Sequence, residues 1–132
     1  MTTELTPGDD WLELRQAAVA SAGLAYAPYS NYPVGAAART SDGRMLSGCN
    51  VENASYGLTL CAEAGLISAL FAAGGGRLAQ FCCVDGAGHL ITPCGRCRQL
   101  LWEHGGPDLI VWSPAGLLPM TELLPQAWGF DD

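Results

Sequence analysis

Apolar residues recur at helical spacing in the first part of the chain, which predicts a helix there. Asp9 or Asp10 is a suitable N-cap residue and Pro28 cannot continue a helix, so the expected helix lies between them. Its apolar positions are Leu12, Ala18 or Val19, Ala22 and Tyr26.

Two further helices are predicted downstream, and each begins at a cysteine. Residues 61–73 read CAEAGLISALFAA and are closed by a run of three glycines at 74–76, which favours a helix end. Residues 94–106 read CGRCRQLLWEHGG, follow Pro93 and end in a glycine pair. We therefore expect two helices whose starts carry cysteine side chains.

Short apolar runs bounded by turn residues predict the strands. Asp42-Gly43 between two such runs is a strong hairpin signal, so residues 34–39 and 44–51 are expected to pair antiparallel. We also expect a buried strand at 78–86, an extended segment at 89–91, a strand at 108–113 and at most a short helix in the tail. This order of elements predicts an α/β sandwich in which helices cover a mixed sheet.

The length of 132 residues fits one domain spanning residues 1–132. The formal net charge is −7 with only six Lys and Arg, which disfavours nucleic acid as a partner, because affinity for phosphates comes from clustered basic residues. The acidic start lacks the apolar run of an export signal, and no stretch reaches the roughly 18 apolar residues of a membrane span. We therefore expect a cytoplasmic protein without a membrane partner.

The chain has six cysteines, which in a short secreted protein would suggest disulfides. Because no export signal is recognised, a reducing compartment is expected, where metal binding or catalysis is the better interpretation. Hydrophobic residues make up 49% of the chain and charged residues 14%. Part of the apolar surface is therefore expected to be covered by other subunits, with a hydrophobic monomer as the alternative.

Three cysteines and one glutamate have a spacing typical of a metal site. Cys61 and Glu63 form a C-x-E pair at the start of one predicted helix, and Cys94 and Cys97 form a P-C-x-x-C motif at the start of another. Three thiolate ligands leave a fourth Zn²⁺ position open for water, as in catalytic rather than structural zinc sites. The remaining cysteines and both histidines lack ligand spacing and are expected to be packing residues: Cys49, Cys82, Cys83, His89 and His104.

The helix starts are expected to affect the chemistry of these side chains. The helix dipole favours anions there and lowers thiol pKa values, and Arg96 or Arg98 are candidates for further charge compensation. Glu63 would lie beside the metal without binding it, where a carboxylate can move a proton from water to a substrate nitrogen. Taken singly, C-x-x-C also fits a redox pair and C-x-E a helix-dipole contact, but together they match a zinc deaminase signature with Cys in place of His.

From about Leu14 to Phe130 the sequence resembles the small homotetrameric cytidine deaminases of the cytidine/deoxycytidylate deaminase superfamily. The motifs that carry the resemblance are YAPYSNYPVGAA at 26–37, GCNVENASYG at 48–57, CAE at 61–63, PCGRCRQLL at 93–101 and LLPQAW at 123–128. The resemblance implies a three-layer α/β/α fold, one Zn²⁺ per subunit and active sites shared within a homotetramer. It also implies hydrolytic conversion of cytidine and 2′-deoxycytidine to the uridines with release of ammonia, in pyrimidine salvage.

The resemblance also implies roles for individual residues. The implied zinc ligands are Cys61, Cys94 and Cys97, and Glu63 is the implied catalytic proton shuttle that also holds N3 of the pyrimidine. The implied substrate contacts are the Ala62 backbone at the base carbonyl, Asn50 and Glu52 at the ribose 3′-hydroxyl, Tyr32 near the base, Ala54 and Tyr56 of a neighbouring subunit at the 5′ side, and Trp128 reaching across to cover the base.

Three positions depart from the family pattern. Ala64 stands where many members have arginine, so charge compensation at the thiolates would fall to Arg98 or the helix dipoles, while Tyr32 and Trp128 replace phenylalanine. Such aromatic exchanges should preserve stacking while changing the size of the pocket.

Three other functions remain open at this point. A deaminase of a cytosine-nucleoside antibiotic of the blasticidin type shares the cysteine motifs, but the Asn50 and Glu52 pair argues for an unmodified ribonucleoside. A polynucleotide editor would need a basic groove, which this acidic chain lacks. A protein in which zinc serves only folding would have no use for Glu63 beside an open coordination position.

Overall fold

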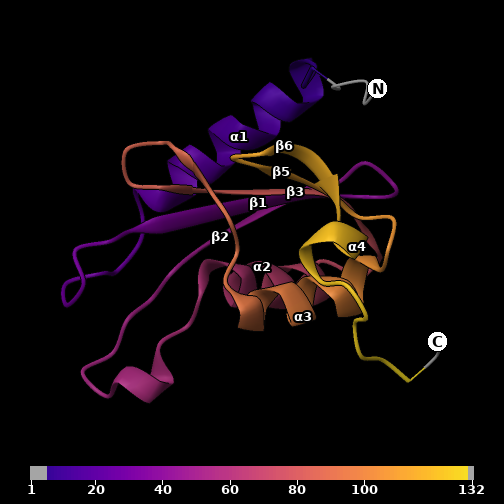
Figure 1. Cartoon of the computed structure of the whole chain (residues 1–132). Helices are drawn as coiled ribbons and strands as arrows, with labels where there is room; N and C mark the ends of the chain where they lie inside the picture. Colours follow the sequence, from indigo (N-terminus) through magenta and orange to yellow (C-terminus); the bar gives the residue numbers. More distant parts are fainter. Residues whose placement is uncertain (1–5, 131–132) are drawn as a thin grey trace.

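The computed structural model describes residues 6–130 and contains a mixed β-sheet with helices on both faces (Figure 1). The sheet runs in the order β2-β1-β3-β5-β6, with β4 paired to β3. This arrangement confirms the three-layer α/β/α sandwich. The first five residues, on which the expectation about an export signal partly rests, and residues 131–132 lie outside the described part.

Most elements correspond to segments predicted from the sequence. The helices are α1 (Asp9–Ala22), α2 (Ala62–Ala72), α3 (Gly95–Gly105) and the short α4 (Met120–Leu123), with a 3₁₀ turn η1 (Tyr56–Leu58). The strands are β1 (Val34–Thr40), β2 (Met45–Cys49), β3 (Leu78–Asp85), β4 (Leu90–Ile91), β5 (Ile110–Ser113) and β6 (Gly116–Pro119). Within residues 6–130, no helix combines the length and the apolar character needed to cross a membrane.

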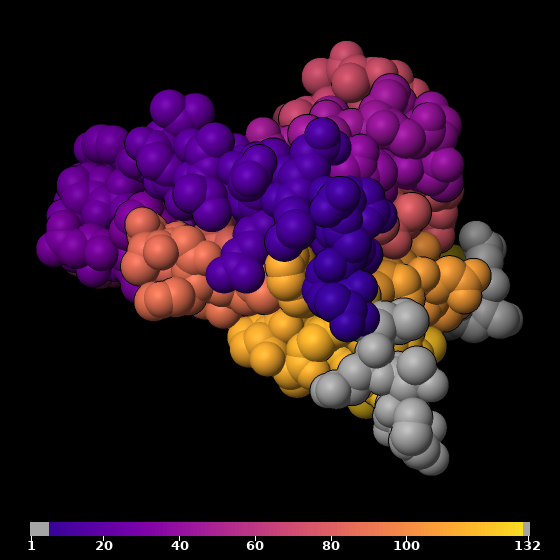
Figure 2. Space-filling view, turned by 90° about the horizontal axis from the view of Figure 1, so that it is seen from above, coloured from indigo at the N-terminus to yellow at the C-terminus, as the bar shows by residue number. Residues whose placement is uncertain are grey.

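The two faces of the sheet bury separate apolar clusters. One cluster lies under α1, which crosses this face of the molecule in indigo in Figure 2, and the other lies under α2 and α3. Successive side chains of a strand point to opposite faces. In β3, Cys82 and Val84 therefore join the α1 cluster, whereas Phe81 and Cys83 join the cluster beneath α2 and α3.

Glycine allows helices to approach the sheet closely. A Cβ atom at Gly48 in β2 would lie 2.5 Å from the carbonyl oxygen of Ala62 and 2.6 Å from the amide nitrogen of Leu66. A Cβ atom at Gly35 in β1 would lie 2.0 Å from the carbonyl oxygen of Ala18 in α1. The Gly48 contact seats the first turn of α2, which carries Glu63, directly on the sheet.

The first helix is shorter than its apolar spacing predicts. It ends at Ala22, so the expectation that it continues to Pro28 is wrong. The backbone of Tyr26 pairs with the segment after β2 instead: its N–H donates to the Asn50 carbonyl at 3.0 Å, and its carbonyl accepts from the Glu52 N–H at 2.8 Å. Tertiary pairing thus outweighs the helical pattern in this segment.

The strand β6 is absent from the sequence prediction. It pairs antiparallel with β5 across a turn in which Gly116 has a φ of +114° and the Ser113 hydroxyl donates to the Gly116 carbonyl at 3.0 Å. Two leucines followed by Pro119 are a weak strand signal, because proline is disfavoured inside sheets. Antiparallel pairing with β5 supplies what the local pattern lacks.

Candidate active site

The starts of α2 and α3 bring three thiols together. Cys61 is the N-cap residue of α2, Cys94 is the N-cap residue of α3, and Cys97 lies in the first turn of α3. Their Sγ atoms lie within 4.8 Å of one another, and no second cluster of three such ligands occurs within residues 6–130. Three soft thiol donors converging on one point fit Zn²⁺, which favours sulfur ligands and keeps an open position when it has three of them.

Burial changes the ionisation of these thiols. Loss of solvent raises the pKa of Cys61 and Cys97 above the ordinary thiol value, and the nearby Glu63 charge raises that of Cys97 further. The lowering of thiol pKa values expected from the helix starts stays a prediction, and in the absence of a bound cation burial is the largest influence on these two thiols. A bound cation is what makes the thiolate forms favourable here.

Glu63 lies at the second position of α2, two residues after Cys61, and its side chain is buried. Burial raises the pKa of its carboxyl group above the usual range. The residue lines a pocket of about 300 Å³ together with Cys61 and Cys94. The Glu63 carboxyl group and two thiols of the cysteine cluster thus line the same cavity.

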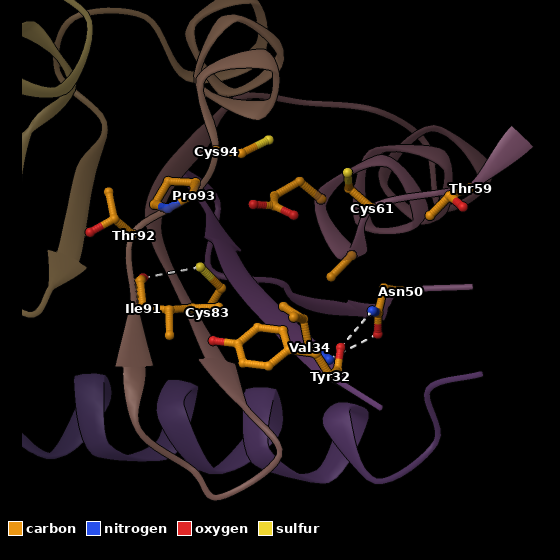
Figure 3. A pocket seen from close by; sticks show the side chains of 12 residues that line it. Tyr32, Val34, Asn50, Thr59, Cys61, Cys83, Ile91, Thr92, Pro93 and Cys94 are labelled. Atoms are coloured by element: carbon orange, nitrogen blue, oxygen red, sulfur yellow. Dashed lines mark hydrogen bonds between the residues drawn. The ribbon is translucent and has the colours of Figure 1, made fainter. Parts of the chain in front are cut away.

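The opposite wall of this pocket comes from segments distant in the sequence. Figure 3 shows Cys61 and Cys94 on one side of the cavity and Tyr32 and Val34 on the other. Tyr32 is about half exposed, at 49%, so it lies at the opening of the pocket rather than at its base. Predominantly apolar walls with a few polar groups are typical of small-molecule sites.

Asn50 stands at the edge of the pocket in a fixed orientation. Its Nδ2 donates to the Tyr32 carbonyl at 3.0 Å, and its Oδ1 accepts from the Val34 N–H at 2.8 Å (Figure 3). A side-chain amide has two donor hydrogens and two lone pairs. One hydrogen and one lone pair of Asn50 therefore remain for a ligand.

Glu52 lies in a neighbouring hollow rather than in the Glu63 pocket. That hollow measures about 290 Å³ and is lined by Tyr29, Ser30, Glu52, Tyr56 and Thr59. Thr59 lines both cavities, so the two are adjacent. A hydrogen bond from the Ser30 hydroxyl lowers the pKa of the Glu52 carboxyl group, which therefore stays ionised at neutral pH.

The remaining residues implied by the family resemblance occupy two further places. The Ala62 backbone lies at the Glu63 pocket, whereas Ala54 and Tyr56 lie on the exposed loop around η1, with Tyr56 75% exposed. Trp128 is 62% exposed and borders a groove on the far side of the cysteine cluster, formed with Ile67 and Leu100. None of Ala54, Tyr56 and Trp128 contributes to the Glu63 pocket of its own chain.

The two candidate arginines differ in their surroundings. Arg98 donates from Nε to the Pro93 carbonyl at 2.9 Å and from Nη1 to the Leu123 carbonyl at 3.1 Å, so it braces the turn before Cys94. Arg96 is exposed, borders the groove beside Cys61, and its charge acts to lower the pKa of that thiol. Its influence is smaller than that of burial, so the pKa of Cys61 is raised overall.

Cys83 is one of several residues of the Glu63 pocket that sequence reasoning missed, with Val34, Thr59, Ile91 and Thr92. Cys83 was expected to be a packing residue, and it is buried, yet it also lines the Glu63 pocket, and its thiol donates to the Ile91 carbonyl at 3.3 Å. The alternation of side chains along β3 was the signal that could have placed it on the same face as α2 and α3. Cys82, one residue earlier, faces α1, and burial raises its pKa to about 12.

Known proteins are similar to this chain in both fold and sequence. Residues 10–113 match the family described as the cytidine and deoxycytidylate deaminase zinc-binding region. A protein named cytidine deaminase from Mycobacterium tuberculosis is 54% identical over 126 residues, covering 96% of this chain and 95% of its own. The crystal structure of cytidine deaminase from Mycobacterium leprae is 59% identical with a TM-score of 0.88, covering 90% of this chain and 100% of that chain.

A more distant crystal structure, that of the cytidine deaminase from Bacillus anthracis, has a TM-score of 0.73 at 19% identity, covering 91% of this chain and 90% of that one. This likeness shows that the fold is retained where little of the sequence is. The family match and the close relatives both extend over the cysteine motifs at the starts of α2 and α3. The chain therefore belongs to the cytidine and deoxycytidylate deaminase zinc-binding family.

Proposed function

We propose that this protein catalyses the zinc-dependent hydrolytic deamination of cytidine and 2′-deoxycytidine to uridine and 2′-deoxyuridine, with release of ammonia. The observation that carries the proposal is the buried Glu63 carboxyl group, which shares one pocket with two thiols of the cysteine cluster. The name and 54% identity of the mycobacterial relative support the substrate class. The same comparison favours a nucleoside over an antibiotic of the blasticidin type.

Cys61, Cys94 and Cys97 would hold the zinc ion, one per subunit. When bound, Zn²⁺ lowers the pKa of a coordinated water and so supplies a hydrolytic nucleophile near neutral pH. Arg98 keeps the turn before Cys94 in place, and the Arg96 charge would favour the thiolate form of Cys61. These residues set the geometry and the charge of the site.

Glu63 would take a proton from the attacking water and deliver it to N3 of the cytosine ring. The oxygen of that water would bond to C4, Glu63 would then move the proton of the new C4 hydroxyl to the exocyclic amine, and the C4–N bond would break to release ammonia. The C4 carbonyl of uridine remains. A carboxyl group whose pKa is raised by burial is suited to both accepting and donating a proton near neutral pH.

The remaining pocket residues would hold the nucleoside. The Ala62 N–H at the start of α2 would bind the base carbonyl, and Tyr32 would pack near the base. Asn50 and Glu52 would hold the ribose 3′-hydroxyl from their adjacent cavities. Asn50 would use its remaining amide hydrogen and lone pair, and Glu52 would act as an acceptor.

We further propose a homotetramer in which Ala54 and Tyr56 contact the 5′ side of a neighbour's nucleoside and Trp128 covers its base. Large apolar side chains exposed around η1 and at the C-terminal end support an interface: Tyr56 is 75% exposed, Leu58 65%, Trp128 62% and Phe130 90%. We place the enzyme in the cytoplasm, in pyrimidine salvage, because free thiol ligands persist in a reducing compartment.

The test is the ultraviolet difference spectrum of zinc-loaded protein incubated with cytidine, run beside blasticidin S. Loss of the cytidine band with uridine and ammonia formed in equal amounts is the expected result. Conversion of blasticidin S alone would overturn the substrate assignment, and conversion of neither compound would overturn the catalytic proposal.

A further inference from the structure

The loop between α1 and β1 has a serine at the centre of its hydrogen bonds. The Ser30 hydroxyl donates to Oε2 of Glu52 and accepts from the Tyr32 N–H at 3.0 Å. The Tyr29 and Ser30 N–H groups donate to Oε1 of Glu52 at 2.9 and 3.1 Å. Two consecutive residues thus hold one carboxylate with three donors.

This set of bonds continues into the Glu63 pocket. The Tyr32 carbonyl accepts from Nδ2 of Asn50 at 3.0 Å, and Oδ1 of Asn50 accepts from the Val34 N–H at 2.8 Å. Glu52 and Asn50 lie in adjacent cavities, and the path from one to the other runs through the Ser30 hydroxyl and the Tyr32 backbone. The orientation of both polar groups therefore depends on the conformation of this loop.

Apolar burial does little to hold that conformation. Ser30, Asn31 and Tyr32 are all exposed, and Asn31 has a φ of +56°, a left-handed backbone conformation that asparagine tolerates in turns. The bonds of the Ser30 hydroxyl reach across Asn31, joining Glu52 on one side to the Tyr32 N–H on the other. Local side-chain to backbone bonds of this kind stabilise turns.

We propose that Ser30 is a positioning residue that presets Glu52, and through Tyr32 also Asn50, for recognition of the sugar hydroxyl of the substrate. The inference rests on the proposed function and extends it to a residue that would not itself touch the reacting atoms. An ionised carboxylate has about four acceptor positions, and the three donors on Glu52 leave about one for a ligand hydroxyl. That capacity matches a single ribose hydroxyl.

The test compares cytidine with 3′-deoxycytidine as substrates of the zinc-loaded enzyme and of its Ser30→Ala variant. Loss of the hydroxyl should reduce the preference for cytidine, measured as the ratio of the two kcat/KM values, by about tenfold, the usual effect of losing a hydrogen bond to a charged group. The loss should appear in KM for cytidine, with kcat little changed. Ser30→Thr, which keeps the hydroxyl, should restore most of the preference.

Matched controls separate positioning from general stability. Ser68→Ala changes an exposed serine of α2 away from both cavities and should leave the ratio unchanged. In a double-mutant comparison, Ser30→Ala should cost little further preference when Glu52→Gln is already present, because both changes remove the same interaction.

Two outcomes would overturn the inference. One is an unchanged ratio in Ser30→Ala, whether kcat/KM stays the same or falls equally for both nucleosides, and the other is full additivity with Glu52→Gln. Partial unfolding of a variant cancels from the ratio, because both nucleosides are measured on the same sample. A wild-type enzyme that deaminates neither nucleoside would instead overturn the proposed function, and this inference with it.

Discussion

Two carboxylates near the site have opposite environments at the residue scale. Burial raises the pKa of Glu63, whereas hydrogen bonds led by that of Ser30 lower the pKa of Glu52. A raised pKa suits a group that must both take up and release a proton, and a lowered pKa suits a permanent acceptor. These divergent environments suit the two carboxylates to the different tasks proposed for them.

The first prediction concerns Glu63. Glu63→Gln keeps the shape of the side chain but removes its proton-carrying ability, so kcat should fall by about 10²- to 10⁴-fold. Zinc content, measured by mass spectrometry, should stay at the wild-type level because all three thiols remain. Glu122→Gln, at an exposed position in α4, is the matched control. Retained turnover in Glu63→Gln would contradict the assigned role.

The second prediction concerns Arg96, whose charge favours the ionised form of Cys61. Because Arg96 is exposed and its charge is screened by water, Arg96→Gln should weaken zinc binding only by about fivefold. Competition with a chelator measures this change. Arg39→Gln, which breaks a surface ion pair with Glu13, should leave zinc affinity unaltered. Equal effects of both variants would show that Arg96 has no specific influence.

At the element scale, the site depends on how two helices are seated on one face of the sheet. The starts of α2 and α3 supply all three thiols, and α2 also supplies Glu63. These helix starts were predictable because each cysteine opens a segment that ends in a run of glycines. The early end of α1 and the strand β6 were not predicted. Pairing of Tyr26 with the segment after β2 decides the first, and pairing with the neighbouring strand β5 decides the second.

The third prediction tests the contact between β2 and α2. Gly48→Ala would push a methyl group against the backbone of Ala62 and Leu66, so it should lower the free energy of unfolding by about 1–3 kcal/mol. It should also reduce activity, because the displaced turn carries Glu63. Thermal and urea unfolding provide the measurement.

The matched control for Gly48→Ala lies in the same helix contact. A Cβ at Gly65 in α2 would meet only the Cys49 carbonyl oxygen, at an ordinary 3.7 Å. Gly65→Ala should therefore raise stability by about 0.5–1 kcal/mol, because alanine is the better helix former. A loss of stability as large as that of Gly48→Ala would mean that the close approach is not the cause.

At the scale of the whole molecule, a single chain does not bring all the proposed substrate-binding residues to the Glu63 pocket. Trp128 borders a groove on the far side of the cysteine cluster, and Tyr56 extends from the exposed loop that projects from the body in Figure 1. Side chains this apolar and this exposed are typical of interfaces. Sharing of sites between subunits would explain both positions.

The fourth prediction tests that sharing by complementation. Homo-oligomers of Trp128→Ala and of Glu63→Gln should each have low activity. A mixture of the two variants refolded together should recover up to about a quarter of wild-type activity. Random assembly pairs an intact Glu63 with an intact neighbouring Trp128 in that fraction of sites. Light scattering of each sample checks the assembly state. Activity that never exceeds the average of the two variants would show that each site belongs to one chain.

The sequence alone determined the chemistry of this protein. Three cysteines and Glu63 lie at predicted helix starts, and local spacing suffices to identify ligand types, the helices that carry them and the α/β class. The tertiary structure decided which groups meet. It ended α1 early, separated Glu52 from Asn50, brought Cys83 to the pocket wall and raised the thiol pKa values by burial. Distances and solvent exposure arise from packing between segments far apart in the chain, which no local pattern specifies.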